Sequence, residues 1–77
     1  METAEKMCRS EARELALRQA PGRPVLVLRP VPVTVRSVPG HALAYTVTHV
    51  LVEWDSDGGY DLRWEASWQV KRLLRAS

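Results

Sequence analysis

Apolar and polar residues alternate most clearly between residues 50 and 68, in the stretch VLVEWDSDGGYDLRWEASW. The alternation runs on both sides of a glycine pair at residues 58 and 59, which is typical of a β-hairpin with one buried face. All three tryptophans and one of the two tyrosines of the 77-residue chain fall in this stretch. The pattern therefore predicts a hairpin that carries the main core of a small β-rich domain.

The length of the hairpin loop determines which residues of the two strands share a face. An odd number of loop residues is needed to bring the apolar residues of both strands to the core: Val50, Val52 and Trp54 with Tyr60, Leu62 and Trp64. A three-residue loop over residues 57–59 meets this condition, with Gly59 in the left-handed conformation. It places Glu53 opposite Arg63 as a cross-strand ion pair. A five-residue loop places Glu53 opposite Asp61, a like-charge pair, so we expect the shorter loop.

The strand before this hairpin changes its buried face. Tyr45 and Val47 are odd-numbered, whereas Val50, Val52 and Trp54 are even-numbered. A straight strand over residues 42–54 would measure roughly 43 Å at about 3.3 Å per residue, which is too long for so small a domain. We therefore expect one long strand that bends at a β-bulge near residues 48–49 and follows a type II turn at residues 39–40.

The first twenty residues have a helical composition. They contain no glycine or proline, and Glu14 and Arg18 stand at the i, i+4 spacing that supports a helix. The apolar face is narrow and rich in small residues, so the helix either docks weakly or is offered to a partner. Prolines then end it, because proline interrupts helical hydrogen bonding. We expect a helix at residues 1–20, a Pro/Gly linker at 21–24 and a small β-barrel domain at 25–77.

Two prolines interrupt the first apolar stretch of the predicted domain. Residues 25–28 form a short strand, and Pro30 and Pro32 confine the run RPVPVTVR to a sheet edge or a barrel rim, because proline has no amide hydrogen to donate. Valines at 31, 33 and 35 alternate with other residues and predict one buried face.

The C-terminal segment fits two structures. Its apolar residues have helical spacing, but a short turn over residues 65–68 followed by a strand over 69–74 fits equally well. We expect the turn and the strand, because a barrel needs a closing strand.

Composition limits the functions that are open to the chain. A protein of 77 residues buries only about 60% of its unfolded surface, which leaves little room for an enclosed active site beside a core. Eleven cationic and nine acidic side chains leave a net charge of +2, too small for a charge-driven nucleic-acid arm. The single cysteine, Cys8, cannot form an intramolecular disulfide, and no apolar run suits a signal peptide or a membrane span. We expect a cytoplasmic, non-enzymatic protein without a cofactor.

The order of the predicted elements resembles the small SH3-like barrels, the group that includes Tudor and KOW modules. The resemblance covers residues 25–75 and rests on the order of the predicted elements and on the sequence segments VLVEW…YDLRW…VKRLL. It implies a mainly β fold with an N-terminal helix, a partly open barrel and a role in binding. Tudor-like barrels use aromatic side chains to hold cations or stack bases. We expect Trp54, Tyr60 and Trp64 in the core and Trp68 partly exposed.

A basic surface near the C-terminus is the candidate site. The last seven residues carry three cations and no acid, and such side chains can contact phosphates. The expected partner is nucleic acid or a nucleic-acid-bound complex, in a regulatory role. The residues expected to contact it are Arg63, Trp68, Lys71, Arg72 and Arg75. The alternative is a solvated face, because the cations are thinly scattered and Arg63 can pair with Glu53.

Other chemistry has little support. The aspartates near the hairpin tip imitate the start of a calcium-binding loop, but glycine and alanine stand where further acidic ligands are required. His41 and His49 have no zinc-ligand spacing. The sequence shows no catalytic triad order, phosphate loop or redox motif. We expect no metal ligands and no catalytic residues.

Two other functions fit the same pattern. A protein–protein adaptor would receive a partner at the barrel edge from Val31 to Val35, or on the N-terminal helix. A small structural subunit of a larger assembly, such as a phage particle, would pack its helix and barrel symmetrically. The sequence leaves the oligomeric state open.

Overall fold

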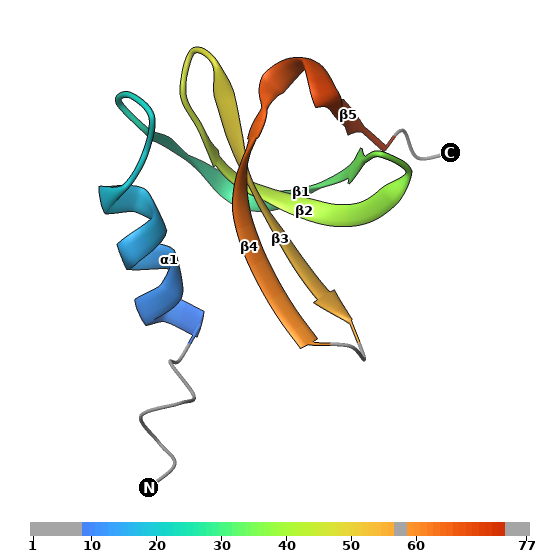
Figure 1. Cartoon of the computed structure of the whole chain (residues 1–77), viewed down its shortest axis with the longest axis horizontal. Helices are drawn as coiled ribbons and strands as arrows, with labels where there is room; N and C mark the ends of the chain where they lie inside the picture. The colour runs from blue at the N-terminus through green and yellow to red at the C-terminus, as the bar shows by residue number, and fades with distance from the viewer. Residues whose placement is uncertain (1–8, 57–58, 74–77) are drawn as a thin grey trace, which may run out of the picture.

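In the computed structural model, the described part of the protein consists of one α-helix, one short 3-10 helix and a five-stranded antiparallel sheet (Figure 1). The structure describes residues 9–56 and 59–73. The elements follow the chain as α1 (Arg9–Arg18), β1 (Val25–Val35), β2 (Val38–Tyr45), β3 (His49–Ser56), β4 (Gly59–Ala66), the 3-10 helix η2 (Ser67–Gln69) and β5 (Val70–Arg72). The strand order across the sheet is β4-β3-β2-β1-β5.

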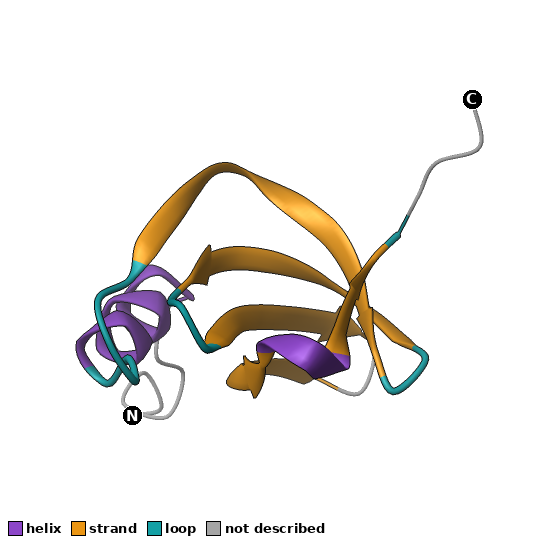
Figure 2. Cartoon of the chain, turned by 90° about the horizontal axis from the view of Figure 1, so that it is seen from above, coloured by secondary structure: helices purple, strands orange, loops and turns teal. Residues whose placement is uncertain are grey.

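The sheet curls because the end of the chain returns to its beginning. The single turn of η2 redirects the chain after β4, so that β5 pairs antiparallel with Val33–Val35 of β1. Figure 2 shows the strands wrapping into a half-barrel below the long arch of β1. The predicted mainly β, SH3-like half-barrel with an N-terminal helix is confirmed, and so are the C-terminal turn and strand.

The barrel core is small and built mainly from valine. β-branched residues suit this position, because they pack well on a pleated sheet. The predicted buried face of β1 is confirmed at Val33 and Val35, which are 4% and 1% exposed. The buried residues of the core and the half-buried ones packed against them are Val31, Val33, Val35, Ala42, Val50, Val52, Trp54 and Val70.

The β3–β4 hairpin has a different register from the predicted one. Ser56 pairs with Gly59, so the loop consists of two residues, 57 and 58, which lie outside the described ranges. Gly59 has the expected positive φ, 128°. Trp54 lies opposite Asp61, and the apolar residues of the two strands therefore face opposite sides of the hairpin.

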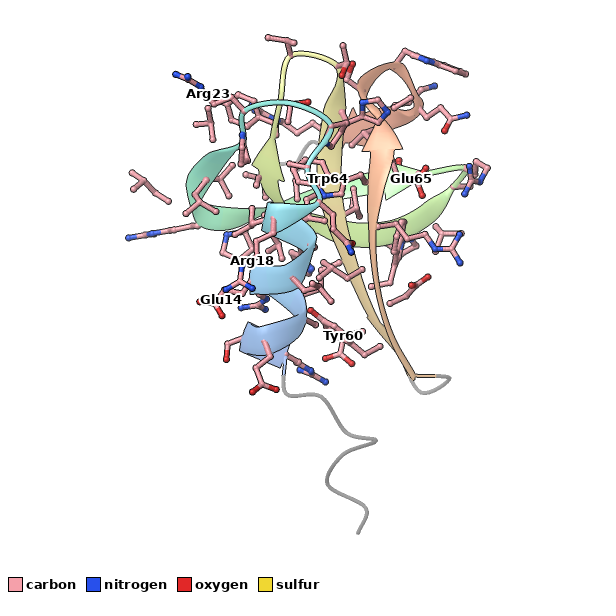
Figure 3. The ribbon with its side chains drawn as sticks, turned by 60° about the vertical axis from the view of Figure 1, so that its left-hand side comes forward. Glu14, Arg18, Arg23, Tyr60, Trp64 and Glu65 are labelled. Carbon is pink, nitrogen blue, oxygen red and sulfur yellow. The ribbon has the colours of Figure 1, made fainter. Side chains whose placement is uncertain are left out.

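The register prediction fails because this hairpin is covered on both faces. β3 turns Val52 and Trp54 towards the barrel core, whereas Trp64 of β4 donates a hydrogen bond from Nε1 to the carbonyl oxygen of Ala16 in α1, at 2.8 Å. Figure 3 shows Trp64 and Tyr60 on the side of the hairpin that faces α1. The predicted common core of Trp54, Tyr60 and Trp64 is therefore wrong.

The helix is attached to the hairpin by charged residues as well. Within the described residues it spans Arg9–Arg18, and residues 1–8 lie outside the described part. Arg13 Nη2 lies 2.6 Å from the Glu53 carboxylate, and Arg9 Nη2 lies 2.7 Å from that of Asp55. The expected Glu53–Arg63 pair does not form, because Glu53 lies on the face covered by α1.

Two predicted features of the middle of the chain are also wrong. The turn after β1 is formed by Arg36 and Ser37, with φ of 52° and 69°, and residues 39–40 belong to β2. Two consecutive residues with positive φ are typical of a two-residue hairpin loop, because that turn matches the twist of the flanking strands. The predicted long bent strand is two strands, because the chain reverses after Tyr45. There the Thr46 hydroxyl accepts hydrogen bonds from the amides of Thr48 and His49, at 3.2 and 3.0 Å.

Strand β1 is an edge over only part of its length. β5 pairs with Val33–Val35, so this part lies inside the sheet, and the prediction of a sheet edge fails here. The amide of Leu73 donates to the carbonyl oxygen of Pro32 at 3.0 Å. Residues 25–31 face β2 on one side, and no described strand pairs with them on the other side.

Candidate binding groove

An apolar groove opens into the barrel interior beside β1 and β5. Its volume is about 420 Å³. Valines from β1, β3 and β5 and alanines from β2 form most of the lining, and the other lining residues are Tyr45, Thr46, Ser67 and Arg72. Such a lining, apolar with a few polar groups, is typical of ligand pockets.

Large apolar side chains are exposed near this groove. Tyr45 lines it, and Val47 and Trp68 each adjoin a lining residue in sequence. Trp68 is 78% exposed and Val47 is 95% exposed. The amide of Ser67 donates to the carbonyl oxygen of Thr48 at 2.9 Å, which holds η2 against the β2–β3 turn. This bond brings the two exposed residues to one end of the barrel.

A large bulge in β1 borders the groove. Leu26 pairs with Ala44 and Val31 pairs with Ala42, so residues 27–30 stand opposite a single residue of β2. Four residues opposite one force the backbone of β1 outwards. Leu28, in this bulge, is fully exposed, and Leu26 is 63% exposed.

A second apolar groove lies on the other side of the bulge, against α1. Its volume is about 230 Å³, and its lining includes Leu17 of α1, Leu26 and Pro30 of β1, and Leu43 and Leu51 of the sheet. The bulged part of β1 is therefore a ridge between two apolar grooves.

A third groove is larger, about 540 Å³, and charged. Arg63 lies in it, with Nε at 3.0 Å from the Asp61 carboxylate. Arg36 is 3.7 Å from the buried carboxylate of Glu65 in the same groove. These arginines are matched by acids of the chain itself, which weakens any attraction for an external anion.

A buried hydrogen-bond network joins the helix to the sheet. Glu53 accepts hydrogen bonds from Arg13 and from the Tyr60 hydroxyl, at 2.6 and 2.7 Å. Burial alone would raise the pKa of Glu53, but these two hydrogen bonds outweigh it and lower the pKa below its ordinary value. Burial and the bond to Glu53 raise the pKa of Tyr60. Glu53 is therefore a carboxylate at neutral pH and fixes α1 in place.

The structure describes four of the five predicted nucleic-acid-binding residues and places Arg63 apart from the others. Arg63 lies in the charged groove, and Arg72 lines the apolar groove. Lys71 and Arg72 are both exposed, but neighbouring residues of a strand point to opposite faces. Trp68 is exposed as predicted. Arg75 lies outside the described residues.

Within the described ranges, no group of three histidine, cysteine, aspartate or glutamate side chains is placed to hold a metal ion. Asp57 of the imitated calcium loop is outside those ranges. None of the described helices is long and apolar enough to cross a membrane. No protein-family model, no curated protein and no solved structure matches the chain.

Sequence reasoning missed the bulge and the grooves beside it. The prolines at 30 and 32 were visible, but the offset of four residues against one depends on how β2 pairs, which no local pattern encodes. One signal in the sequence could have pointed to a binding surface in this region: residues 15–52 contain four arginines and no acidic residue.

Proposed function

We propose that this protein is a non-enzymatic binding module that takes up a segment of a partner protein in the apolar groove of the barrel interior, beside β1 and β5. The observation that carries the proposal is the groove itself, which is lined mainly by valine and alanine of the barrel interior and lies beside exposed Tyr45, Val47 and Trp68. Exposed apolar patches that adjoin a groove mark interaction sites more often than isolated surface residues do. This proposal develops the adaptor function: the groove is lined by Val31 and Val33 of the expected edge and also by Val27, in the part of β1 that does not pair with β5.

Filling the mouth of the groove should abolish binding. A random peptide library displayed on phage is selected against the whole protein, and the selected peptides are titrated against Ser67→Trp. Ser67 is exposed and lines the groove, so a large ring there occupies the ligand space without entering the core. We expect affinity to fall about tenfold or more, a loss of about 1.4 kcal/mol.

Glu11→Trp is the matched control, because it adds the same ring at an exposed position of α1 that does not line this groove. It should leave binding unchanged. The proposal is contradicted if the selection yields no binder, or if the selected peptides bind Ser67→Trp and Glu11→Trp with equal affinity.

Nucleic acid is the second candidate ligand, and one observation favours it. Trp68 is exposed, and Lys71 and Arg72 follow it without an ion pair to any residue in the described part of the chain. An exposed ring can stack on a base while nearby cations contact phosphates. Arg75 follows this surface in the sequence, whereas Arg63 lies on β4, at the opposite end of the strand order from β5, so a ligand would have to span both places to contact it.

The salt dependence of binding tests this candidate. Mixed-sequence single-stranded DNA and RNA are titrated at several salt concentrations. Replacing both Lys71 and Arg72 with alanine should lower the slope of log affinity against log salt by up to about two, because each phosphate contact releases a counterion. Trp68→Ala should weaken binding at an unchanged slope, because stacking releases no ions. No binding by the folded protein at low salt removes nucleic acid as a candidate.

A further inference from the structure

We infer that the ligand is an extended acidic peptide that adds as a strand to the edge of β1 over residues 25–30, which no described strand covers, in line with β5. This inference rests on the proposed function and specifies how the partner segment is held. In this mode, called β-augmentation, backbone hydrogen bonds supply affinity and pockets for alternate side chains supply specificity.

The backbone of the bulge is available for such pairing. Residues 27–29 take part in no ladder pair with β2 or β5. Pro30 and Pro32 lack amide hydrogens, so the donors on this edge are those before Pro30. Unpaired edge groups next to exposed Leu26 and Leu28 form a template for another strand.

The two apolar grooves fit the side chains of an added strand. Successive residues of a strand point to opposite faces of the sheet. One set would enter the apolar groove of the barrel, whose lining includes Val27 and Val31. The other set would lie beside Leu26 and Pro30, in the groove against α1. The central residues of the ligand are therefore apolar or small.

Charge defines the ends of the ligand. Arg23 and Arg29 are exposed at either end of the Val25–Leu28 stretch, and neither has an acidic partner in the described ranges. Figure 3 shows Arg23 projecting from the loop after α1, on the same side as Arg18. Complementary charge favours a peptide with acidic residues flanking the apolar centre. A second copy of this chain fits less well, because pairing β1 with β1 would bring these arginines close to each other.

The inference is tested with the blocked synthetic peptide EDVTVTVDE and with KKVTVTVKK as its charge-reversed control, using the whole protein labelled for NMR. We expect the acidic peptide to bind, to shift the amide signals of residues 27–29 and to slow their hydrogen exchange. Arg29→Glu should lower its affinity about tenfold. Arg9→Glu, which makes the same charge change at an exposed residue of α1 that lines neither apolar groove, should not.

The other outcomes overturn the inference. With EDVTVTVDE, these outcomes are no binding at millimolar concentration, or binding that does not protect the amides of residues 27–29 from exchange. Tighter binding of KKVTVTVKK than of EDVTVTVDE overturns it too. So do the same amide shifts when they are caused by single-stranded DNA and not by the peptide. Self-association that Arg29→Glu strengthens, because the substitution removes the repulsion between facing arginines, would identify a second copy as the occupant. If library peptides remain sensitive to Ser67→Trp while the β1 amides stay unprotected, the strand-addition inference fails and the proposed groove function stands.

Discussion

Replacing Arg13 with methionine should lower the free energy of unfolding by about 2 kcal/mol, because it leaves the Glu53 carboxylate without its cation. Glu53 is 9% exposed, so water cannot replace the lost bonds freely. Removal of one partner from a fully buried pair costs about 3–5 kcal/mol. The expected loss is smaller here, because the Arg13 side chain is 42% exposed. Chemical denaturation at pH 7, followed by tryptophan fluorescence, measures the change.

Arg9→Met provides the matched control, because Arg9 joins the same helix to the same strand through Asp55. Both side chains of that pair are about half exposed, at 56% and 48%, so the loss should stay below about 1 kcal/mol. The double variant Arg13→Met with Glu53→Met should recover much of the lost stability, because it removes the unpaired charge. Equal losses for Arg9→Met and Arg13→Met would show that burial does not govern these pairs.

The same network gives a pH dependence with a defined sign. The folded-state pKa of Glu53 lies below its ordinary value of 4.5, so its contribution to stability is present above pH 4.5 and is lost as pH falls through the folded-state pKa. Arg13→Met removes the principal hydrogen bond that lowers this pKa. The variant should therefore lose less stability than the wild type as the solution is acidified from about pH 5. The substitution makes Glu53 bind its proton more tightly in the folded state. For every tenfold increase in that proton affinity, the stability lost on acidification by the two proteins should differ by about 1.4 kcal/mol.

Replacing Gly40 with alanine should cost about 2–3 kcal/mol, through overpacking in the middle of the sheet. A Cβ atom at residue 40 would lie 2.8 Å from the carbonyl oxygen of Glu53 and 3.0 Å from the Trp54 ring. The carbonyl belongs to β3, in which Glu53 pairs with His41, so it cannot retreat without disturbing the β2–β3 pairing. Thermal unfolding followed by circular dichroism measures the effect.

His41→Ala, at the exposed neighbouring position, should change stability by less than about 0.5 kcal/mol. Trp54→Leu in the Gly40→Ala background should relieve part of the clash, so the two losses should not add. The contact with the Glu53 carbonyl would remain. A Gly40→Ala variant as stable as the wild type would mean that β2 and β3 lie further apart than the structure shows.

Much of the fold could be predicted from patterns that are local. Alternating valines identify β1 and its buried face, and proline and glycine end the helix. These features depend on backbone preferences and on side-chain periodicity within a few residues, so they needed no knowledge of distant contacts. The closing strand did need it, because the local pattern of the C-terminal segment fitted a helix equally well and the strand was expected from the need to close a barrel.

The pairing register and the candidate site could not be predicted in this way. The prediction assumed that the apolar residues of both hairpin strands share one face, and α1 removes that constraint by covering the second face against Trp64. Likewise, the bulge at residues 27–30 exists because β2 offers one residue where β1 supplies four.

The sequence by itself determined that this protein is a small, mainly β domain with valines buried along β1, a helix that either docks or is offered to a partner, and little room for an enclosed active site. Only the tertiary structure decided that the core is built mainly from valine, that Glu53 pairs with Arg13, that Arg63 is held by Asp61, and that two apolar grooves flank a part of β1 whose outer edge no described strand covers. The reason is physical: hydrophobic periodicity fixes which side of an element is buried, whereas partners, register and open edges depend on how elements far apart in the chain meet.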